Sequence, residues 1–210
     1  MLRKKALLIG NYTYPEYHPL QGVDTEVSLI LQDILSVQCS ENRNMFRLEN
    51  LGAYDLCISY ADSWREPISS VQMGGLLAYT ASGGGLLVLH NGISLQSKSE
   101  FAQLVGAKFA GHPPARPLEL TVAAPEHPAV DGVEPFAIEE EPYRFEFDPF
   151  VQRTVLLEYE EDGQKYPAAW AHTYGLGRVV YVMPGHQEGV LKRPEMRRLL
   201  YRTAKWAARA

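Results

Sequence analysis

A histidine directly follows a glycine-led apolar segment in the first half of the chain. Gly83-Gly84-Gly85 leads into Leu86–Leu89, and His90 is the next residue. In an open α/β sheet, ligands gather outside the carboxyl ends of strands, so His90 is a candidate for chemistry. The same kind of turn carries the Ser or Cys of a nucleophile elbow in other α/β enzymes. Because histidine occupies this position, the simplest thiol or hydroxyl nucleophile is excluded there.

A second histidine motif, Gly185-His186-Gln187-Glu188-Gly189, follows the last expected strand. A histidine with a carboxylate two residues later can form an oriented acid–base pair, in which the carboxylate fixes the imidazole tautomer. We therefore take His186 and Glu188 as candidate catalytic residues beside His90.

Three consecutive carboxylates, Glu139–Glu141, precede Pro142 and Tyr143. A run of like charge is by default a solvated face. The proline and the aromatic residue indicate instead that this segment folds back against the protein. We expect Glu141 to point inward with a perturbed pKa, as a fourth catalytic candidate, and Tyr143 to contact the ligand.

Polar and aromatic residues that follow two expected strands are further candidates for ligand binding. Asn11, Tyr12 and His18 follow the first strand, and loops after parallel strands face the crevice of the sheet. Asp62 and Trp64 follow the next one. A carboxylate beside an aromatic ring suits a sugar, whose hydroxyls and C–H faces they would bind. The alternatives are a turn at Asn11, packing at Tyr12, and a solvated loop in which Trp64 covers the core.

Two more histidines lie in loops with proline. In Gly111-His112-Pro113-Pro114 the proline restricts the residue before it, so His112 is held and is a candidate for ligand binding. His127-Pro128, ahead of Asp131-Gly132, indicates a turn with a structural role.

The elements that position these residues alternate in the first half of the chain. The pattern predicts strands over 5–9, 54–60 and 86–89, and helices that start near Asp24 and cover 68–81 and 99–105. Strands separated by helices of this length favour a parallel, doubly wound sheet.

The second half differs, because its expected strands, 118–122, 154–159, 168–172 and 178–183, follow one another directly. Asp162-Gly163 signals a tight hairpin between two of them. This half is therefore predicted to be an antiparallel or mixed β region added to the first sheet. A final helix from Pro194 places Met196, Leu199, Leu200 and Thr203 on one face. We expect one domain over residues 1–210.

Composition narrows the class of protein. The 210 residues are 46% hydrophobic and 21% charged, with a net charge of -5, so no basic footprint for nucleic acid is present. No apolar run approaches the roughly 18 residues that span a bilayer. Two cysteines, Cys39 at an expected helix end and Cys57 within a strand, provide no disulfide framework. We expect a cytoplasmic protein without a membrane partner.

Taken in order, several short motifs resemble the ThuA-like (trehalose utilisation) family, within the class I glutamine amidotransferase-like superfamily. The matching segments are 83–90, 111–113, 127–128, 131–132, 141–143, 167–172, 175–181 and 185–186. The resemblance implies a flavodoxin-like sheet with helices on both faces and an extra β region. It also implies a link to sugar metabolism, including oxidised (keto) disaccharides, and some members look like metal binders.

The chain departs from a working class I amidotransferase at the elbow. Such an enzyme has a Cys there and a His-x-Glu pair near its C-terminal part. His186 and Glu188 keep the second spacing, but His90 occupies the elbow, and neither cysteine has an elbow context. Because the nucleophile of that chemistry is a thiolate, we predict no glutamine hydrolysis by that route.

Two functions remain open at this point. The first is an enzyme that acts on a sugar or keto-sugar derivative, as a hydrolase, lyase or isomerase. The second is a non-catalytic carbohydrate-binding or regulatory protein with a degenerate amidotransferase fold. The cofactor is unknown, with zinc as one candidate on His90, His112 and His186. The expected partner is a small carbohydrate, and a homo-oligomer is left open. Convergence of the histidines and a carboxylate on one cleft would favour the enzyme.

Overall fold

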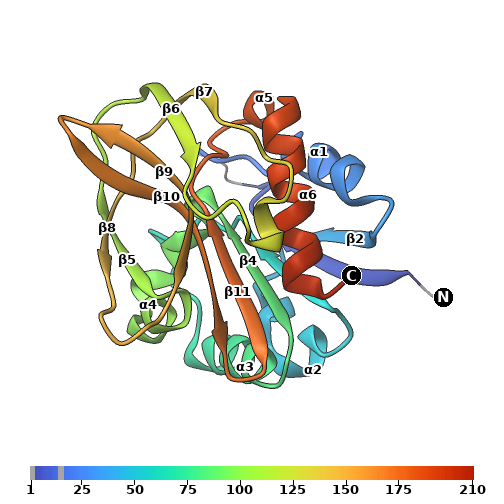
Figure 1. The fold of residues 1–210 in the computed structure, drawn as a ribbon. Coiled ribbons are helices and arrows are strands. Elements are labelled where there is room, and N and C mark those ends of the chain that lie inside the picture. The colour runs from blue at the N-terminus through green and yellow to red at the C-terminus, as the bar shows by residue number, and fades with distance from the viewer. Residues whose placement is uncertain (1–2, 14–16) are drawn as a thin grey trace.

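A nine-stranded mixed sheet runs through the computed structural model, which describes residues 3–13 and 17–210 (Figure 1). The strands lie in the order β2-β1-β3-β4-β11-β10-β9-β6-β7. Their bounds are β1 (Lys4–Ile9), β2 (Leu35–Ser40), β3 (Leu56–Ser59), β4 (Gly85–Leu89), β6 (Arg116–Val122), β7 (Phe136–Glu140), β9 (Thr154–Glu161), β10 (Gln164–Tyr174) and β11 (Gly177–Val182). A separate antiparallel pair joins β5 (Ala107–Gly111) to β8 (Arg144–Phe147). The expectation of a mixed α/β fold is confirmed.

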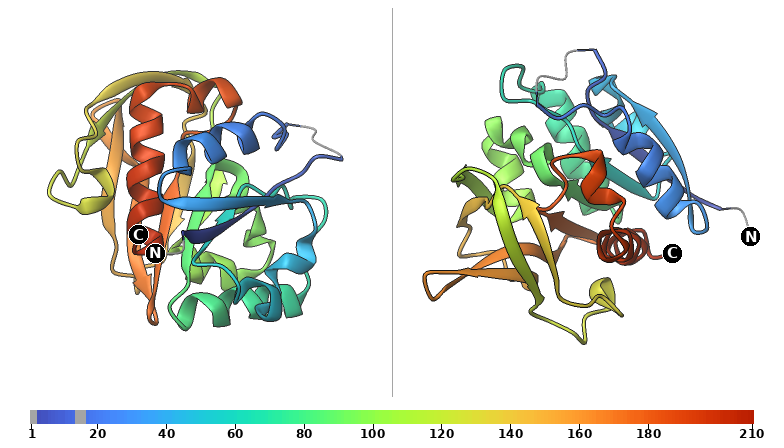
Figure 2. Two further views of the ribbon diagram at one scale, coloured as in Figure 1. Left: turned by 90° about the vertical axis from the view of Figure 1, so that its right-hand side faces the viewer. Right: turned by 90° about the horizontal axis from the view of Figure 1, so that it is seen from above.

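The first five strands of this order, from β2 to β11, pair in parallel. β3 and β4 are buried along their whole length, as expected for strands covered on both faces. Helices α1 (Val23–Leu31), α5 (Glu188–Leu191) and α6 (Pro194–Ala208) lie together on one side of this parallel part, and α2 (Leu48–Leu51), α3 (Ser70–Ala81) and α4 (Ser99–Val105) lie on the other (Figure 2). The carboxyl ends of the parallel strands therefore meet at one edge.

The strands from β11 to β7 pair antiparallel, with β10 and β9 as a long hairpin. Asp162 and Gly163 form its turn with positive φ angles of 52° and 74°, as the Asp-Gly signal predicts. This hairpin returns the chain so that β11 runs parallel beside β4, which brings the segment after residue 182 next to His90.

Four strands, β2, β5, β7 and β8, were not anticipated from the sequence. β2 lies at the edge of the sheet and is only partly buried, so it lacks the continuous apolar run of an inner strand. Cys39 lies in this strand rather than at a helix end, which corrects the expectation. Cys57 lies in β3 as expected and is fully buried.

Helix α6 closes one face of the sheet. Pro194 is at its start, where a missing N–H costs nothing. Met196, Leu199, Leu200 and Thr203 are all buried, as their helical spacing predicts. Within the described part of the chain, no helix combines the length and the apolar character needed to cross a bilayer.

Candidate functional site

His90 occupies a sharp turn at the carboxyl end of β4. Its φ of 45° lies in the left-handed region that residues with a side chain seldom adopt. A 3₁₀ segment over His90–Ser97 follows. Gly92 is required two residues later, because a Cβ there would lie 2.0 Å from the carbonyl oxygen of Ser59. The chain thus retains a strand–turn–helix elbow with an imidazole at its tip.

Hydrogen bonds fix the tautomer of the buried His90 ring. Its Nδ1 lies 2.7 Å from the carbonyl oxygen of Met183, so Nδ1 carries the proton and donates it. Its Nε2 is left as an acceptor, 3.0 Å from the Tyr143 hydroxyl and 3.2 Å from His186 Nδ1. The lone pair of Nε2 therefore faces the other site residues.

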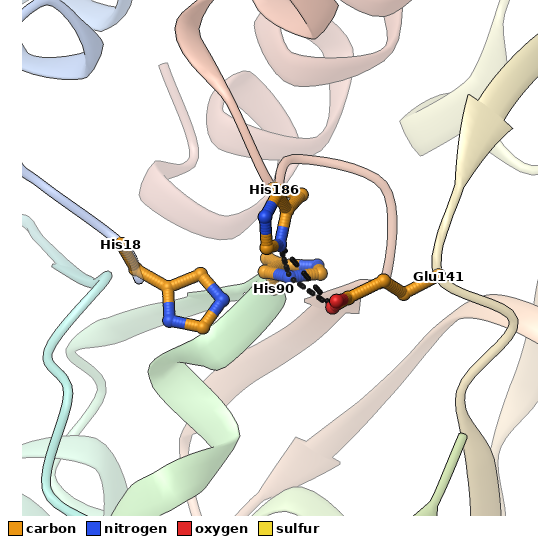
Figure 3. Close-up of side chains that lie close together, drawn as sticks. All are labelled: His18, His90, Glu141 and His186. Atoms are coloured by element: carbon orange, nitrogen blue, oxygen red, sulfur yellow. Dashed lines mark hydrogen bonds and ion pairs between the residues drawn. The ribbon is translucent and has the colours of Figure 1, made fainter. Parts of the chain in front are cut away.

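Glu141 joins two of the imidazoles. Its Oε2 lies 3.2 Å from His186 Nδ1 and 3.4 Å from His90 Nε2 (Figure 3). Burial alone would raise the pKa of Glu141, but its hydrogen bond from His186 and its electrostatic interaction with the imidazoles outweigh burial and hold that pKa well below its usual range. The bond to Glu141 in turn raises the pKa of His186. The group at the centre of the site is thus an ionised carboxylate.

Glu140, the last residue of β7, holds the loop that carries His186. Its Oε2 accepts the backbone N–H groups of Gly185 at 2.7 Å and His186 at 3.1 Å. Sequence reasoning missed this residue within the acidic run. The alternation of buried Phe136, Ile138 and Glu140 along β7 is the signal that could have found it.

His18 enters the site from the loop after β1. Its ring centre lies 5.1 Å from that of His90 and 4.8 Å from that of His186. Nδ1 of His18 contacts Asp62 Oδ2 at 3.3 Å, whereas Nε2 is buried and has no hydrogen-bond partner among the described residues. Burial lowers the pKa of His18, while its hydrogen bond lowers that of Asp62. A neutral ring donating Nδ1–H to Asp62 leaves the Nε2 lone pair facing the cluster.

These four side chains form a compact group of potential metal ligands. One ligand atom from each of His18, His90, Glu141 and His186 can be chosen so that all lie within 4.8 Å of one another. We call this group the histidine cluster. Its members come from four distant chain segments, as Figure 3 shows.

His112 lies beside the histidine cluster rather than in it. Its Nε2 is 3.9 Å from Glu141 Oε1, and its ring stacks on Tyr143 with 5.2 Å between ring centres. The expected metal set of His90, His112 and His186 is therefore not what the fold brings together. The histidine cluster contains His18 and Glu141 in place of the expected His112.

Glu188 is not placed as the partner of His186. It is the first residue of α5, and its carboxylate forms an ion pair with Lys192 one turn later. Closeness in sequence suggested the pair, but the helix that begins at residue 188 directs this side chain along its own surface. The partner of His186 is Glu141, from a segment 45 residues earlier.

A cavity of about 410 Å³ adjoins His18 through Asp62. Its lining includes Asn11, Asp62 and Trp64. Asn11 Oδ1 accepts the backbone N–H of Asp62 at 2.9 Å, and the half-exposed Trp64 ring packs on Phe109. The structure thus brings these three expected ligand-binding residues together.

One other expected ligand-binding residue, Tyr12, lies away from this cavity, and His127 has a structural role. Tyr12 donates its hydroxyl to Asp24 at 2.6 Å, and it is not among the residues that line the cavity. His127 accepts the backbone N–H of Ala129 at 3.2 Å, which is the structural role that its turn predicts.

One comparison with known proteins identifies a family. A family model described as ThuA, trehalose utilisation, matches residues 9–207. No curated protein matches the chain.

Solved structures with a similar fold include a ThuA-like protein from Parabacteroides merdae, with a TM-score of 0.81 and 19% identity over 98% of this chain and 90% of that one. A ThuA-like protein from Bacteroides uniformis gives 0.79 and 18% over 98% and 91%. Cytoplasmic protein STM1381 from Salmonella typhimurium gives 0.69 and 15% over 97% and 99%. At these identities the likeness concerns the fold.

Proposed function

The chain belongs to the ThuA family, whose description is trehalose utilisation, and on this premise we propose that it is an enzyme that acts on a sugar or keto-sugar derivative at the histidine cluster. The observation that carries the proposal is convergence. His90, His186 and Glu141 lie within 3.2–3.4 Å of one another although they are far apart in sequence. A binding protein that had merely filled its elbow with histidine would not need an ionised carboxylate between two imidazoles.

The cavity beside the cluster supports a carbohydrate as the ligand. Trp64 offers a half-exposed ring for the C–H face of a sugar, and Asp62 offers a carboxylate for its hydroxyls. Asp62 also contacts His18, so a sugar bound to Asp62 would lie beside the histidine cluster.

The polar groups around the cluster suit chemistry at a sugar oxygen. Burial, followed by the negative charge of Glu141, raises the pKa of Tyr143, so this hydroxyl stays protonated and donates to His90 Nε2, while its oxygen can accept a hydrogen bond from a sugar hydroxyl. The cluster itself can act in two ways, either by exchanging a proton at His186 or by holding a cation. These groups could catalyse hydrolysis, elimination or isomerisation of a sugar.

Glutamine amidotransferase activity has no support in this site. Burial raises the pKa of Cys57 to about 12, and this thiol lies in the middle of β3. Cys39 lies in the edge strand β2. A thiolate at the elbow, which that reaction needs, is replaced by His90.

The proposal also covers the fold around the site, the cellular location and the partner. The strand order β2-β1-β3-β4-β11 supports a flavodoxin-like, doubly wound core with an added antiparallel region. We further propose one domain, a cytoplasmic location, and a small carbohydrate as partner.

A turnover screen tests the proposed function. Purified protein is incubated with disaccharides and their 3-keto derivatives, and products are followed by chromatography with mass detection. We expect conversion of at least one sugar, reduced about 100-fold or more in Glu141→Gln. Glu139→Gln is the matched control, because it makes the same change on an exposed neighbour. A sugar that binds without conversion would establish the binding-protein alternative, and unchanged turnover in Glu141→Gln would remove the site assignment.

A further inference from the structure

We propose that His18, His90, His186 and Glu141 bind a single divalent metal ion, and that zinc suits the site best. This inference rests on the geometry of the side chains and stands apart from the identity of any sugar.

The distances between three of the ligand atoms match those of a metal site. His90 Nε2, His186 Nδ1 and Glu141 Oε2 form a triangle with sides of 3.2, 3.2 and 3.4 Å. In tetrahedral zinc sites with metal–ligand distances of about 2.0–2.1 Å, the ligand atoms are about 3.3 Å apart. An ion can therefore lie over this triangle with little movement of the three side chains.

His18 provides the fourth atom. Its side chain is 8% exposed, and its Nε2 has no hydrogen-bond partner among the described residues. In Figure 3 one ring nitrogen of His18 points towards His90 and Glu141. A buried polar atom without a hydrogen-bond partner lowers the free energy of unfolding by roughly 1–3 kcal/mol, so a partner for this nitrogen would stabilise the protein. A cation at the centre of the cluster supplies it.

Outer contacts orient the imidazoles as they do around known metals. Metal-binding histidines commonly donate their second ring N–H to a carbonyl or a carboxylate. His90 donates Nδ1–H to the Met183 carbonyl, and His18 has Asp62 at its Nδ1. Glu140 fixes the backbone of His186. Each of the three imidazoles thus has a contact that helps to position it.

The ligand types favour a borderline ion. Three imidazole nitrogens and one carboxylate oxygen suit zinc and its neighbours, whereas Mg²⁺ and Ca²⁺ prefer sites made of oxygen alone. With four protein ligands, such an ion would act as a Lewis acid on a sugar oxygen by accepting that oxygen as a fifth ligand. That role rests on the proposed function, whereas binding of the ion does not.

Metal titration tests the site without any substrate. Protein stripped with a chelator is titrated with Zn²⁺ by calorimetry, and Co²⁺ is used as a probe of tetrahedral coordination by visible absorption. We expect one ion per chain and an intense cobalt spectrum. His18→Ala and His186→Ala should each weaken zinc affinity about 100-fold or more, and Asp62→Asn about 10-fold to 100-fold.

His112→Ala is the matched control, because it removes an imidazole adjacent to the cluster, and it should keep the one-to-one stoichiometry. Circular dichroism establishes that each variant is folded, and Asp62→Asn keeps the test decisive if a ligand variant does not fold. Folded wild-type protein that takes up no ion would overturn the proposal. Zinc affinity unchanged in His18→Ala would overturn the ligand set. Metal binding without sugar turnover would reject the proposed function and leave this inference standing.

Discussion

The carboxylate of Glu140 accepts the backbone N–H of His186, with 3.1 Å between Oε2 and N. A second N–H, from Gly185, reaches the same oxygen at 2.7 Å. Glu140 is 2% exposed, and a buried polar group needs hydrogen-bond partners. The backbone of the loop at residues 185–186 provides them for this carboxylate. A strand from the antiparallel region thereby fixes a histidine that follows the parallel region.

The first prediction concerns this contact. Oε1 of Glu140 also accepts the backbone N–H of Glu141 at 2.9 Å. Glu140→Gln replaces one of the two accepting oxygens by an NH₂ group that cannot accept, so at least one of these hydrogen bonds is lost. We expect the free energy of unfolding to fall by about 2 kcal/mol, measured by urea denaturation. Glu139→Gln, an exposed neighbour, should stay within about 0.5 kcal/mol of wild type. Equal stability of the two variants would contradict the role given to Glu140.

The second prediction concerns the elbow. Gly92→Ala puts a methyl group 2.0 Å from the Ser59 carbonyl oxygen, so the backbone has to move. We expect a loss of about 3 kcal/mol of stability and a lower melting temperature. Gly74→Ala, in α3, meets nothing within 4 Å and should be stabilising by about 0.5–1 kcal/mol. A Gly92→Ala variant that melts at the wild-type temperature would contradict the close packing of Gly92 against the Ser59 carbonyl group.

The third prediction concerns pH and uses a histidine outside the site. His172 is buried on β10, with Nε2 3.0 Å from the Leu104 carbonyl oxygen, and burial lowers its pKa. Below pH about 6.5 the unfolded chain binds a proton that the folded chain resists, so stability falls as the pH falls.

His172→Gln can keep the hydrogen bond to Leu104 and removes this titration. Denaturation at pH 7.5 and pH 5.5 should therefore show a smaller loss of stability in the variant than in wild type. Identical losses would mean that His172 does not contribute to the acid sensitivity of the fold.

The fourth prediction separates ligand binding from metal binding. Trp64 is 42% exposed, so Trp64→Ala should change stability by no more than about 0.5 kcal/mol. Loss of its ring should weaken affinity for the sugar found in the turnover screen by about tenfold. Zinc affinity, measured by the same titration, should not change. A variant that binds sugar normally would place the sugar elsewhere.

Local sequence patterns predicted part of this structure. Inner strands such as 86–89 could be predicted because continuous apolar runs require burial on both sides. His90 and His186 could be predicted because each follows such a strand. The edge strand β2 and the acidic strand β7 lack that pattern, and they were missed.

Contacts between distant segments could not be predicted in the same way. His186 has a carboxylate two residues away in sequence, yet its partner is Glu141, because α5 carries Glu188 towards Lys192. His18 was expected only as a ligand-binding residue of a loop. Its place in the cluster depends on Asp62 and on the order of the strands, which no local pattern encodes.

The return of β11 to the side of β4 also has a consequence for how the protein is made. Until about residue 182 has left the ribosome, β4 lacks one of its two neighbours, and Leu86–Leu89 border an open sheet edge. Such edges invite pairing with other chains during synthesis. Native pairing of β4 is therefore completed only when β11 is available, and His186, which follows β11, joins the other cluster residues only then.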